Sequence, residues 1–344
     1  MNEQEKKAML DEIKAKMTGD RMQDIVVLEE EIRKLETQEG GQALAEELLQ
    51  MAMGMISPEE QDYLQKTLFL DGRRLNQVYG EMQGLMRQGN TAEAIKLSRA
   101  LYEHIIMHFR ESDQERFFSF RNPFESNLYH ILYHPTKKLL KAPFDFSLYI
   151  GAHAYNLIET RRAPEAIPVL KEAIRYNPVN PDPRFELAEV YKVLEKPEEL
   201  LETICDTLPL CTSAYAIARC YANLGFWAVE IKDYESAVRF YYESLNFADH
   251  PAIPGELKHI EVISGKPLVP PTKEMINKAF AKYDIYHGPG QEVLHVAREL
   301  AKQAEEAEQW REAAFYLNIV VSLIRDEDAQ NRLNAIVAKM KAES

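Results

Sequence analysis

The sequence predicts an all-α protein, and three observations support this fold class. Residues that favour strands are scarce, since Val and Thr together contribute 26 of the 344 residues, whereas Ala alone contributes 35. The chain is 46% hydrophobic and 28% charged, which is typical of a globular protein. From residue 75 onward, segments with helical patterns come in pairs that short polar turns join.

The first 70 residues are predicted to form an acidic helical domain. Helices are expected over 3–17, over 22–38, over 42–55 and from Ser57 to about Leu70. The last of these has a clear start signal, because Ser57 can cap the helix, Pro58 suits its first position and Glu60 can complete a capping box. Residues 1–60 hold 7 basic and 15 acidic side chains, so much of the net charge of −14 lies there.

The predicted helix over 22–38 has a narrow apolar seam. Ile25, Leu28, Ile32 and Leu35 follow one another at spacings of 3, 4 and 3, which gives two heptads of a coiled-coil pattern. The seam can pack against its own domain or against a second copy of the chain. A homodimer through residues 22–38 is therefore one of two open interpretations.

Small residues recur at positions where two helices of a pair would cross. In four pairs a small residue is followed, twelve positions later, by the residue expected to face it: Ala154 and Ala166, Ala188 and Leu200, Gly225 and Ala237, Ala301 and Ala313. A weaker copy begins with Met82 and Ala94. Antiparallel helices 8–10 Å apart need small side chains at the crossing, so the pattern predicts helix hairpins.

These positions resemble the tetratricopeptide repeat family. The closest copy spans 218–251, where the family residues are Tyr221, Leu224, Gly225, Asp233, Tyr234, Ala237, Tyr241 and Ser244. In the same copy Lys232 stands where the family has a turn glycine. Further copies lie at 75–108, 147–180, 181–214 and 294–327, and together they cover about half of the chain. The resemblance implies a right-handed superhelix of stacked antiparallel hairpins over 71–344, with insertions at about 110–146 and 249–293.

The charge and the apolar segments limit the classes of partner. A net charge of −14 repels nucleic-acid phosphates and anionic lipid surfaces, so neither is expected as a partner. No stretch of about 18 apolar residues occurs, and the start of the chain lacks the pattern of a secretory signal. The three cysteines form no C-x-x-C pair, so we expect no disulfide framework and a cytoplasmic location.

The resemblance also implies a binding site on the concave face, which the first helix of each pair lines. By this placement the candidate partner-binding residues are Tyr155, Phe185, Glu189, Lys192, Arg219, Asn223, Phe226 and Arg298. Of the positions at which some family members hold a peptide carboxylate, only Arg219 is basic here, so that binding mode is not expected. The predicted function is a non-enzymatic scaffold or adaptor that binds a protein or peptide without a cofactor.

Two other functions stay open. One is a peptide-responsive regulator in which the N-terminal helices act as the effector. The other is a metal-binding protein or metal-dependent enzyme, because His104 with His108 and His130 with His134 are spaced by four residues and each pair could share one helix face. No Gly-rich phosphate loop or nucleophile elbow occurs, which favours a protein that is not an enzyme.

Aromatic residues are concentrated between 117 and 155. Ten of these 39 positions are aromatic: Phe117, Phe118, Phe120, Phe124, Tyr129, Tyr133, Phe144, Phe146, Tyr149 and Tyr155. The segment is expected either to plug the helical array or to line its binding groove.

Overall fold

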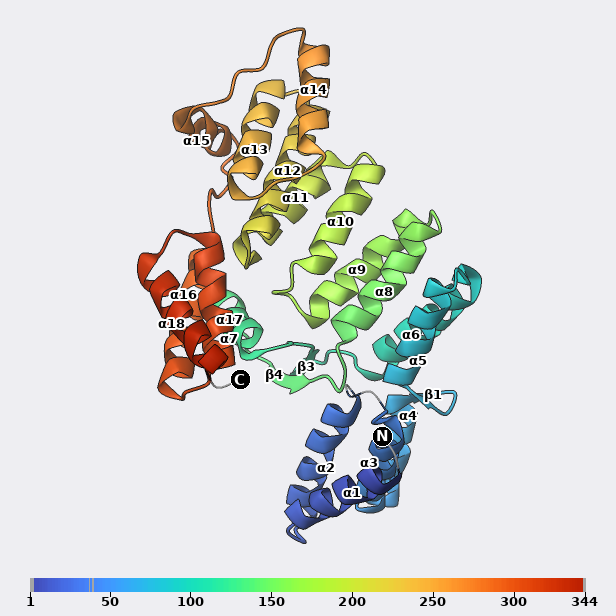
Figure 1. Cartoon of the computed structure of the whole chain (residues 1–344). Helices are drawn as coiled ribbons and strands as arrows, with labels where there is room; N and C mark the ends of the chain where they lie inside the picture. Colours follow the sequence, from blue (N-terminus) through green and yellow to red (C-terminus); the bar gives the residue numbers. More distant parts are fainter. Residues whose placement is uncertain (1–2, 37, 39, 343–344) are drawn as a thin grey trace. The chain divides into compact units, whose positions relative to one another are not determined.

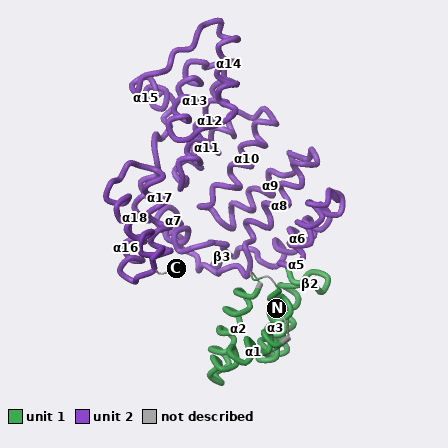
Figure 2. Tube along the Cα trace, in the orientation of Figure 1, with its two compact units in different colours: residues 1–75 green, residues 76–344 purple. Residues whose placement is uncertain are grey.

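The computed structural model describes residues 3–36, 38 and 40–342, and over these residues the protein is all-helical, with eighteen α-helices and two small two-stranded sheets (Figure 1). The chain divides into two compact units, residues 1–75 and residues 76–344 (Figure 2). Among the described residues, no helix is both long and apolar enough to cross a membrane.

Unit 1 holds four helices and one hairpin. These are α1 (Glu3–Lys16), α2 (Arg21–Glu36), α3 (Gln42–Gly54), α4 (Pro58–Leu68), β1 (Phe69–Leu70) and β2 (Arg73–Arg74). The capping box that begins α4 is confirmed, since Ser57 Oγ accepts from the Glu60 N–H and the Glu60 carboxylate accepts from the Ser57 N–H. The helix ends at Leu68, two residues before the predicted end, because Asp71 and Gly72 adopt positive φ and turn the chain into an antiparallel hairpin.

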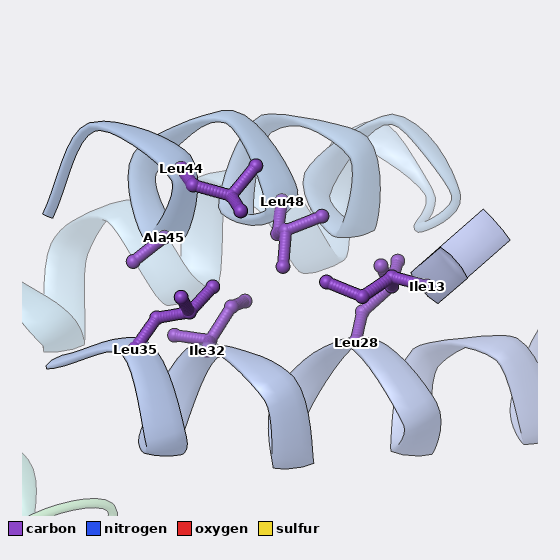
Figure 3. Close-up of a cluster of buried hydrophobic side chains, with 7 residues drawn as sticks. All are labelled: Ile13, Leu28, Ile32, Leu35, Leu44, Ala45 and Leu48. Atoms are coloured by element: carbon purple, nitrogen blue, oxygen red, sulfur yellow. The ribbon is translucent and has the colours of Figure 1, made fainter. Parts of the chain in front are cut away.

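The apolar seam of α2 is used inside unit 1. Leu28, Ile32 and Leu35 are at most 4% exposed and pack with Ile13 of α1 and with Leu44, Ala45 and Leu48 of α3 (Figure 3). Ile25 is half-buried, and Thr37, also in the predicted helix, lies outside the described residues. Of the two interpretations of this seam, these contacts favour packing within its own domain, because Leu28, Ile32 and Leu35 already belong to the core of unit 1. They give no support to a homodimer through residues 22–38.

Unit 2 contains α5 to α18. Its first part is α5 (Leu75–Arg87, of which Leu75 belongs to unit 1), α6 (Thr91–His108), β3 (Glu115–Phe118), α7 (Pro123–Tyr133), β4 (Lys138–Lys141), α8 (Phe146–Glu159), α9 (Ala163–Tyr176), α10 (Asp182–Val193) and α11 (Pro197–Thr207). Its second part is the 3-10 turn η1 (Leu208–Leu210), then α12 (Ala214–Glu230), α13 (Tyr234–Phe247), α14 (Ile253–Ser264), α15 (Lys273–Lys282), α16 (Gln291–Glu306), α17 (Trp310–Leu323) and α18 (Glu327–Ala342). Packing runs from α8 to α13 through each successive neighbour, and α16 packs on α17, α7 and η1.

The prediction of small residues inside the hairpins is confirmed. The side chains at Ala154, Ala166, Ala188, Ala237, Ala301 and Ala313 are at most 2% exposed. At Gly225 the ring of Tyr241 lies so close that an added Cβ would come within 2.6 Å of it. The helices of α8 with α9, α12 with α13 and α16 with α17 pack directly on one another.

Five hairpins share one turn geometry. In each, the first helix is followed by a residue with φ between 53° and 74°, namely Gly89, Arg161, Glu195, Lys232 or Glu308. The next N–H then donates to a carbonyl five residues earlier, at 2.8–3.0 Å, as in Asp233 to Ala228. This is the Schellman motif, which satisfies the last carbonyls of the first helix while reversing the chain.

The two insertions contain more secondary structure than was predicted from the sequence. In the first, β3 and β4 pair in parallel around α7, and the edge of Phe117 packs on Phe109, which also contacts Phe146. Of the eight aromatic side chains in this insertion, four are buried in unit 2, three are half-buried and Tyr133 is exposed. The second insertion contains α15, which begins after the predicted Thr272 cap. It also contains α14, a helix that was not predicted because the segment is rich in prolines.

Candidate functional site

A pocket of about 390 Å³ lies in unit 2, between α5, α8 and the start of α10. Its lining residues come from five segments far apart in the sequence: Tyr79, Met82, Gln83, Met86 and Arg87; Arg121; Asp145, Ser147, Leu148, Gly151, Ala152, Tyr155 and Asn156; Leu170; Asn180, Asp182, Pro183 and Glu186. A pocket of this size is within the range that holds small ligands or several side chains of a peptide.

One wall of the pocket is apolar and comes from α5 and α8. Tyr79 of α5 stacks on Tyr149 of α8 with ring centroids 4.2 Å apart, which holds the two helices together beside the pocket. Leu148 and Tyr155 are 51% and 49% exposed, so two large apolar side chains face solvent where they could cover a ligand. Between them, an added Cβ at Gly151 would meet no atom within 4 Å, so this glycine leaves open space.

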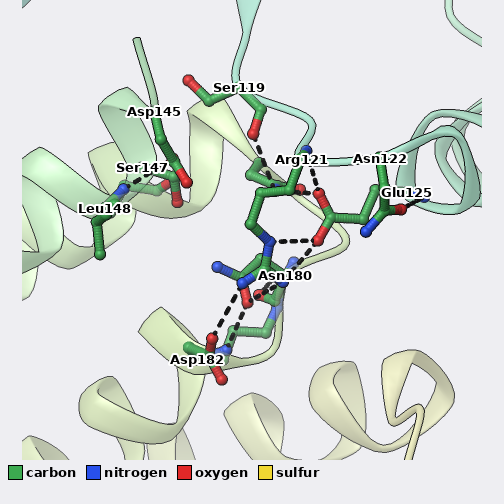
Figure 4. A network of polar contacts seen from close by, with 12 residues as sticks. Ser119, Arg121, Asn122, Glu125, Asp145, Ser147, Leu148, Asn180 and Asp182 are labelled. Carbon is green, nitrogen blue, oxygen red and sulfur yellow. Dashed lines mark hydrogen bonds and ion pairs between the residues drawn. The ribbon is translucent and has the colours of Figure 1, made fainter. Parts of the chain in front are cut away.

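The other wall is polar and is organised around Arg121. The Arg121 Nε donates to Glu125 Oε1 at 2.6 Å, and its backbone N–H donates to Glu125 Oε2 at 2.7 Å. The guanidinium also donates to Asn180 Oδ1 at 3.3 Å and to Asp182 Oδ2 at 3.5 Å (Figure 4). This network joins the segment before α7 to the segment between α9 and α10, and it fixes the polar wall.

Three carboxylates line this polar wall. Asp145 caps α8 by accepting from the Leu148 N–H at 3.0 Å, and burial raises the pKa of its carboxyl, an effect that this hydrogen bond opposes. The side chains of Asp182 and Glu186 are 72% and 42% exposed. The wall therefore combines one partly desolvated carboxylate with two accessible ones.

The structure brings five of the predicted site residues together on α10 and α12, next to the pocket. The Arg219 guanidinium lies 4.5 Å from the centroid of the Phe185 ring, and Lys192 Nζ lies 5.2 Å from that of Phe226. Glu189 joins the two cations, since its Oε1 is 3.0 Å from Lys192 Nζ and 3.8 Å from Arg219 Nη2. A further predicted residue, Tyr155, lines the pocket itself.

Three predicted site residues are not available in the expected way. Phe185 is 5% exposed beneath Arg219, and Asn223 is 3% exposed, so neither side chain can anchor a partner in this conformation. The Nδ2 of Asn223 has no hydrogen-bond partner among the described residues. Arg298 lies on α16 and forms a 2.8 Å ion pair with Asp326, outside the group on α10 and α12.

Most of the residues that line the pocket were not predicted from the sequence. Its apolar wall includes Tyr79, Met82 and Met86, which belong to the weaker predicted copy at 75–108, and its polar wall begins in the first insertion with Arg121. One local signal was available, because Leu148, Gly151 and Tyr155 follow one another by three and four residues and thus share a helix face.

The two histidine pairs, the basis of the metal-binding alternative, are placed differently from each other. The helix α7 ends at Tyr133, so His134 has a φ of 42° and leaves the face of His130, whose Nδ1 instead lies 2.7 Å from the Ser126 carbonyl oxygen. The rings of His104 and His108 are 4.5 Å apart on α6, where burial lowers the pKa of His108. Over residues 3–36, 38 and 40–342, no group of three or more His, Cys, Asp or Glu side chains is arranged to hold a metal ion.

Comparison of the chain with protein-family models and with curated protein sequences gives no match. Its function is therefore inferred from the pocket and the residues around it.

Proposed function

We propose that the chain is a non-enzymatic binding protein that holds a polypeptide segment in the pocket of unit 2. We also propose that the hairpins of residues 76–344 form an irregular superhelix of the tetratricopeptide type. The five shared turns and the buried small residues support this second proposal, because both recur at equivalent places in successive hairpins.

The proposed function rests mainly on which helices line the pocket. It is lined mainly by α5, α8 and the start of α10, which are the first helices of successive hairpins. In a stack of such hairpins the first helices line the inner face, and this is where the family resemblance places a ligand. The surface next to it, on α10 and α12, extends the site with alternating charges over Phe185 and Phe226.

The chemistry of the pocket suits a polypeptide. Exposed Leu148 and Tyr155 offer apolar contact, and rigid aromatic side chains bind with a small loss of conformational entropy. The carboxylates on the opposite wall can accept hydrogen bonds from the amides or the polar side chains of a bound segment. Apolar anchors on one side and acceptors on the other fit an extended or helical peptide.

A blocking substitution tests this function. Gly151→Phe places a ring in the open space of the pocket, at a helical position where an added Cβ meets no neighbour. Gly255→Phe is the matched control, because Gly255 is exposed on α14, has equal free space and does not line the pocket. The probe is a phage library that displays random dodecapeptides, selected against the full chain.

We expect the native chain and Gly255→Phe to enrich the same peptides, and Gly151→Phe to bind those peptides at least tenfold more weakly, about 1.4 kcal/mol. The proposal is contradicted if the native chain enriches no peptide, or if Gly151→Phe binds the selected peptides as tightly as the control does.

A further inference from the structure

We propose that the polar wall of this pocket holds a lysine or arginine side chain, so that the chain selects polypeptide segments with a basic residue flanked by apolar ones. This inference rests on the proposed function and specifies the class of partner. It follows from the charges of the wall, its free acceptor positions and the apolar surface beside it.

The charged side chains that line the pocket leave its polar wall with a negative surplus. Arg121 is neutralised by Glu125, whose side chain is only 6% exposed and is held by three groups, including Asn177 Nδ2 at 2.9 Å. The remaining carboxylates that line the pocket are Asp145, Asp182 and Glu186. Arg219 lies 3.6 Å from Glu186 and balances that charge in part.

After these pairs are set aside, Asp145 and Asp182 face a single further lining cation, the exposed Arg87 at the end of α5. The charge surplus of the polar wall is negative, as it is for the whole chain at −14. An incoming anion would be repelled, whereas a basic segment would be attracted both at long range and at the wall itself.

The carboxylates of Asp182 and Asp145 also have acceptor positions that the protein does not use. Asp182 accepts only a long 3.5 Å hydrogen bond from Arg121 through its carboxylate, although an ionised carboxylate offers about four acceptor positions. Asp145 uses Oδ1 to accept from Leu148. An ammonium or guanidinium group can therefore find acceptors on both side chains without breaking the network around Arg121. Burial raises the pKa of Asp145, and a bound cation would favour its ionised form.

Both basic side chains carry an apolar stem, and the pocket offers apolar surface to cover it. Lysine and arginine bury their methylene groups against apolar surface while the charged end reaches polar groups. Here Leu148, Gly151 and Tyr155 form such a surface one to three turns along α8 from the cap at Asp145. A cation can also approach the exposed Tyr155 ring. An acidic or phosphorylated segment could use the apolar wall only, with its charges beside the carboxylates.

The test uses the peptides selected by the native full chain from the dodecapeptide library. For the tightest peptide, each lysine or arginine in turn is replaced by norleucine, which keeps the apolar stem and removes the charge. We expect a basic residue in the selected sequences and at least a tenfold loss of affinity for one norleucine analogue, since a charged hydrogen bond is lost.

The variant Asp182→Asn removes one carboxylate whose side chain is 72% exposed. The control is Asp328→Asn, the same substitution on α18, where the carboxylate is 80% exposed and does not line the pocket. Asp182→Asn should bind the selected peptide and its norleucine analogue with nearly equal affinity, whereas Asp328→Asn should keep the tenfold preference. The preference should also fall as sodium chloride is raised.

The possible results distinguish a failure of this inference from a failure of the proposed peptide binding. Selected peptides without a basic residue, or a preference that persists in Asp182→Asn, would overturn the inference while leaving peptide binding intact. If no peptide is enriched at all, the proposed function itself fails.

Discussion

At the scale of single residues, His153 is the clearest case of a buried titratable group. It lies on α8 at 3% exposure, and its Nδ1 is 2.9 Å from Ser98 Oγ on α6. Burial, aided by the charges of Arg99 and Arg162, lowers the pKa of His153 to about 4. The folded protein therefore keeps this ring neutral at pH values where an exposed histidine is protonated.

This shift predicts how stability depends on pH. Below about pH 6.5 the unfolded chain binds a proton at His153 that the folded chain does not bind, so the free energy of unfolding falls as the pH drops toward 4. Between pH 7 and pH 4.5 the loss from this residue should be about 2 to 3 kcal/mol. His153→Gln keeps a polar group near Ser98 but cannot titrate, so the variant should lose less stability over the same range.

The measurement is urea unfolding of both proteins at the two pH values. Other acidic groups titrate equally in both, so the difference between the proteins isolates His153. The prediction is contradicted if the two proteins lose the same free energy.

Single residues also show why the candidate site was only partly predictable. The helical register predicted which face of its helix Tyr155 occupies, and that face lines the pocket, since register depends on the sequence of one helix alone. It could not show that Arg219 of α12 covers Phe185 of α10, or that Arg121 joins Asn180. Those contacts unite segments that are dozens of residues apart, and no local pattern encodes them.

At the scale of elements, helices with local start and stop signals were predicted closely. The capping box at Ser57 began α4, and the cap at Thr272 began α15. The parallel pairing of β3 with β4 was not predicted, because it joins two short segments that α7 separates in the sequence. Lys232 stands at a turn position where a glycine would be unstrained, yet it takes a φ of 62°, so the hairpin geometry prevails over the local preference of the residue.

The contact between α12 and α13 gives a test of hairpin packing. A Cβ at Gly225 would lie 2.6 Å from two carbons of the Tyr241 ring, and that ring is 2% exposed and has little room to move. Gly225→Ala should therefore destabilise unit 2 by about 1 to 3 kcal/mol, although alanine favours helix. Gly84→Ala, on α5, meets no atom within 4 Å and should stabilise by about 0.5 to 1 kcal/mol.

Both variants are compared with the native protein by urea unfolding, with the signal followed through the transition of unit 2. Opposite signs for the two glycines are the expected result. Equal stabilisation by both would show that α12 and α13 do not approach as closely as the structure indicates.

Over the whole chain, each of the two units buries hydrophobic side chains of its own among the described residues. The sequence predicts a division near residue 70, where the acidic segment gives way to the predicted repeats, and contacts divide the chain after Leu75. Unit 1 is built on the cluster around Leu28, whereas the buried aromatic and aliphatic side chains of residues 76–344 form the interior of unit 2. Each unit thus has its own source of cooperative stability.

Two cores predict two unfolding transitions, each sensitive to substitutions in only one unit. Leu28 is fully buried in unit 1, so Leu28→Ala should cost that unit about 2 to 5 kcal/mol and lower the midpoint of one calorimetric transition. Gly225→Ala should lower only the other midpoint, because Gly225 and Tyr241 both belong to unit 2. In the double variant each midpoint should fall by the same amount as in the single variant of its own unit, since substitutions at distant sites act independently. A single transition that both substitutions move would show that the two cores unfold as one cooperative structure.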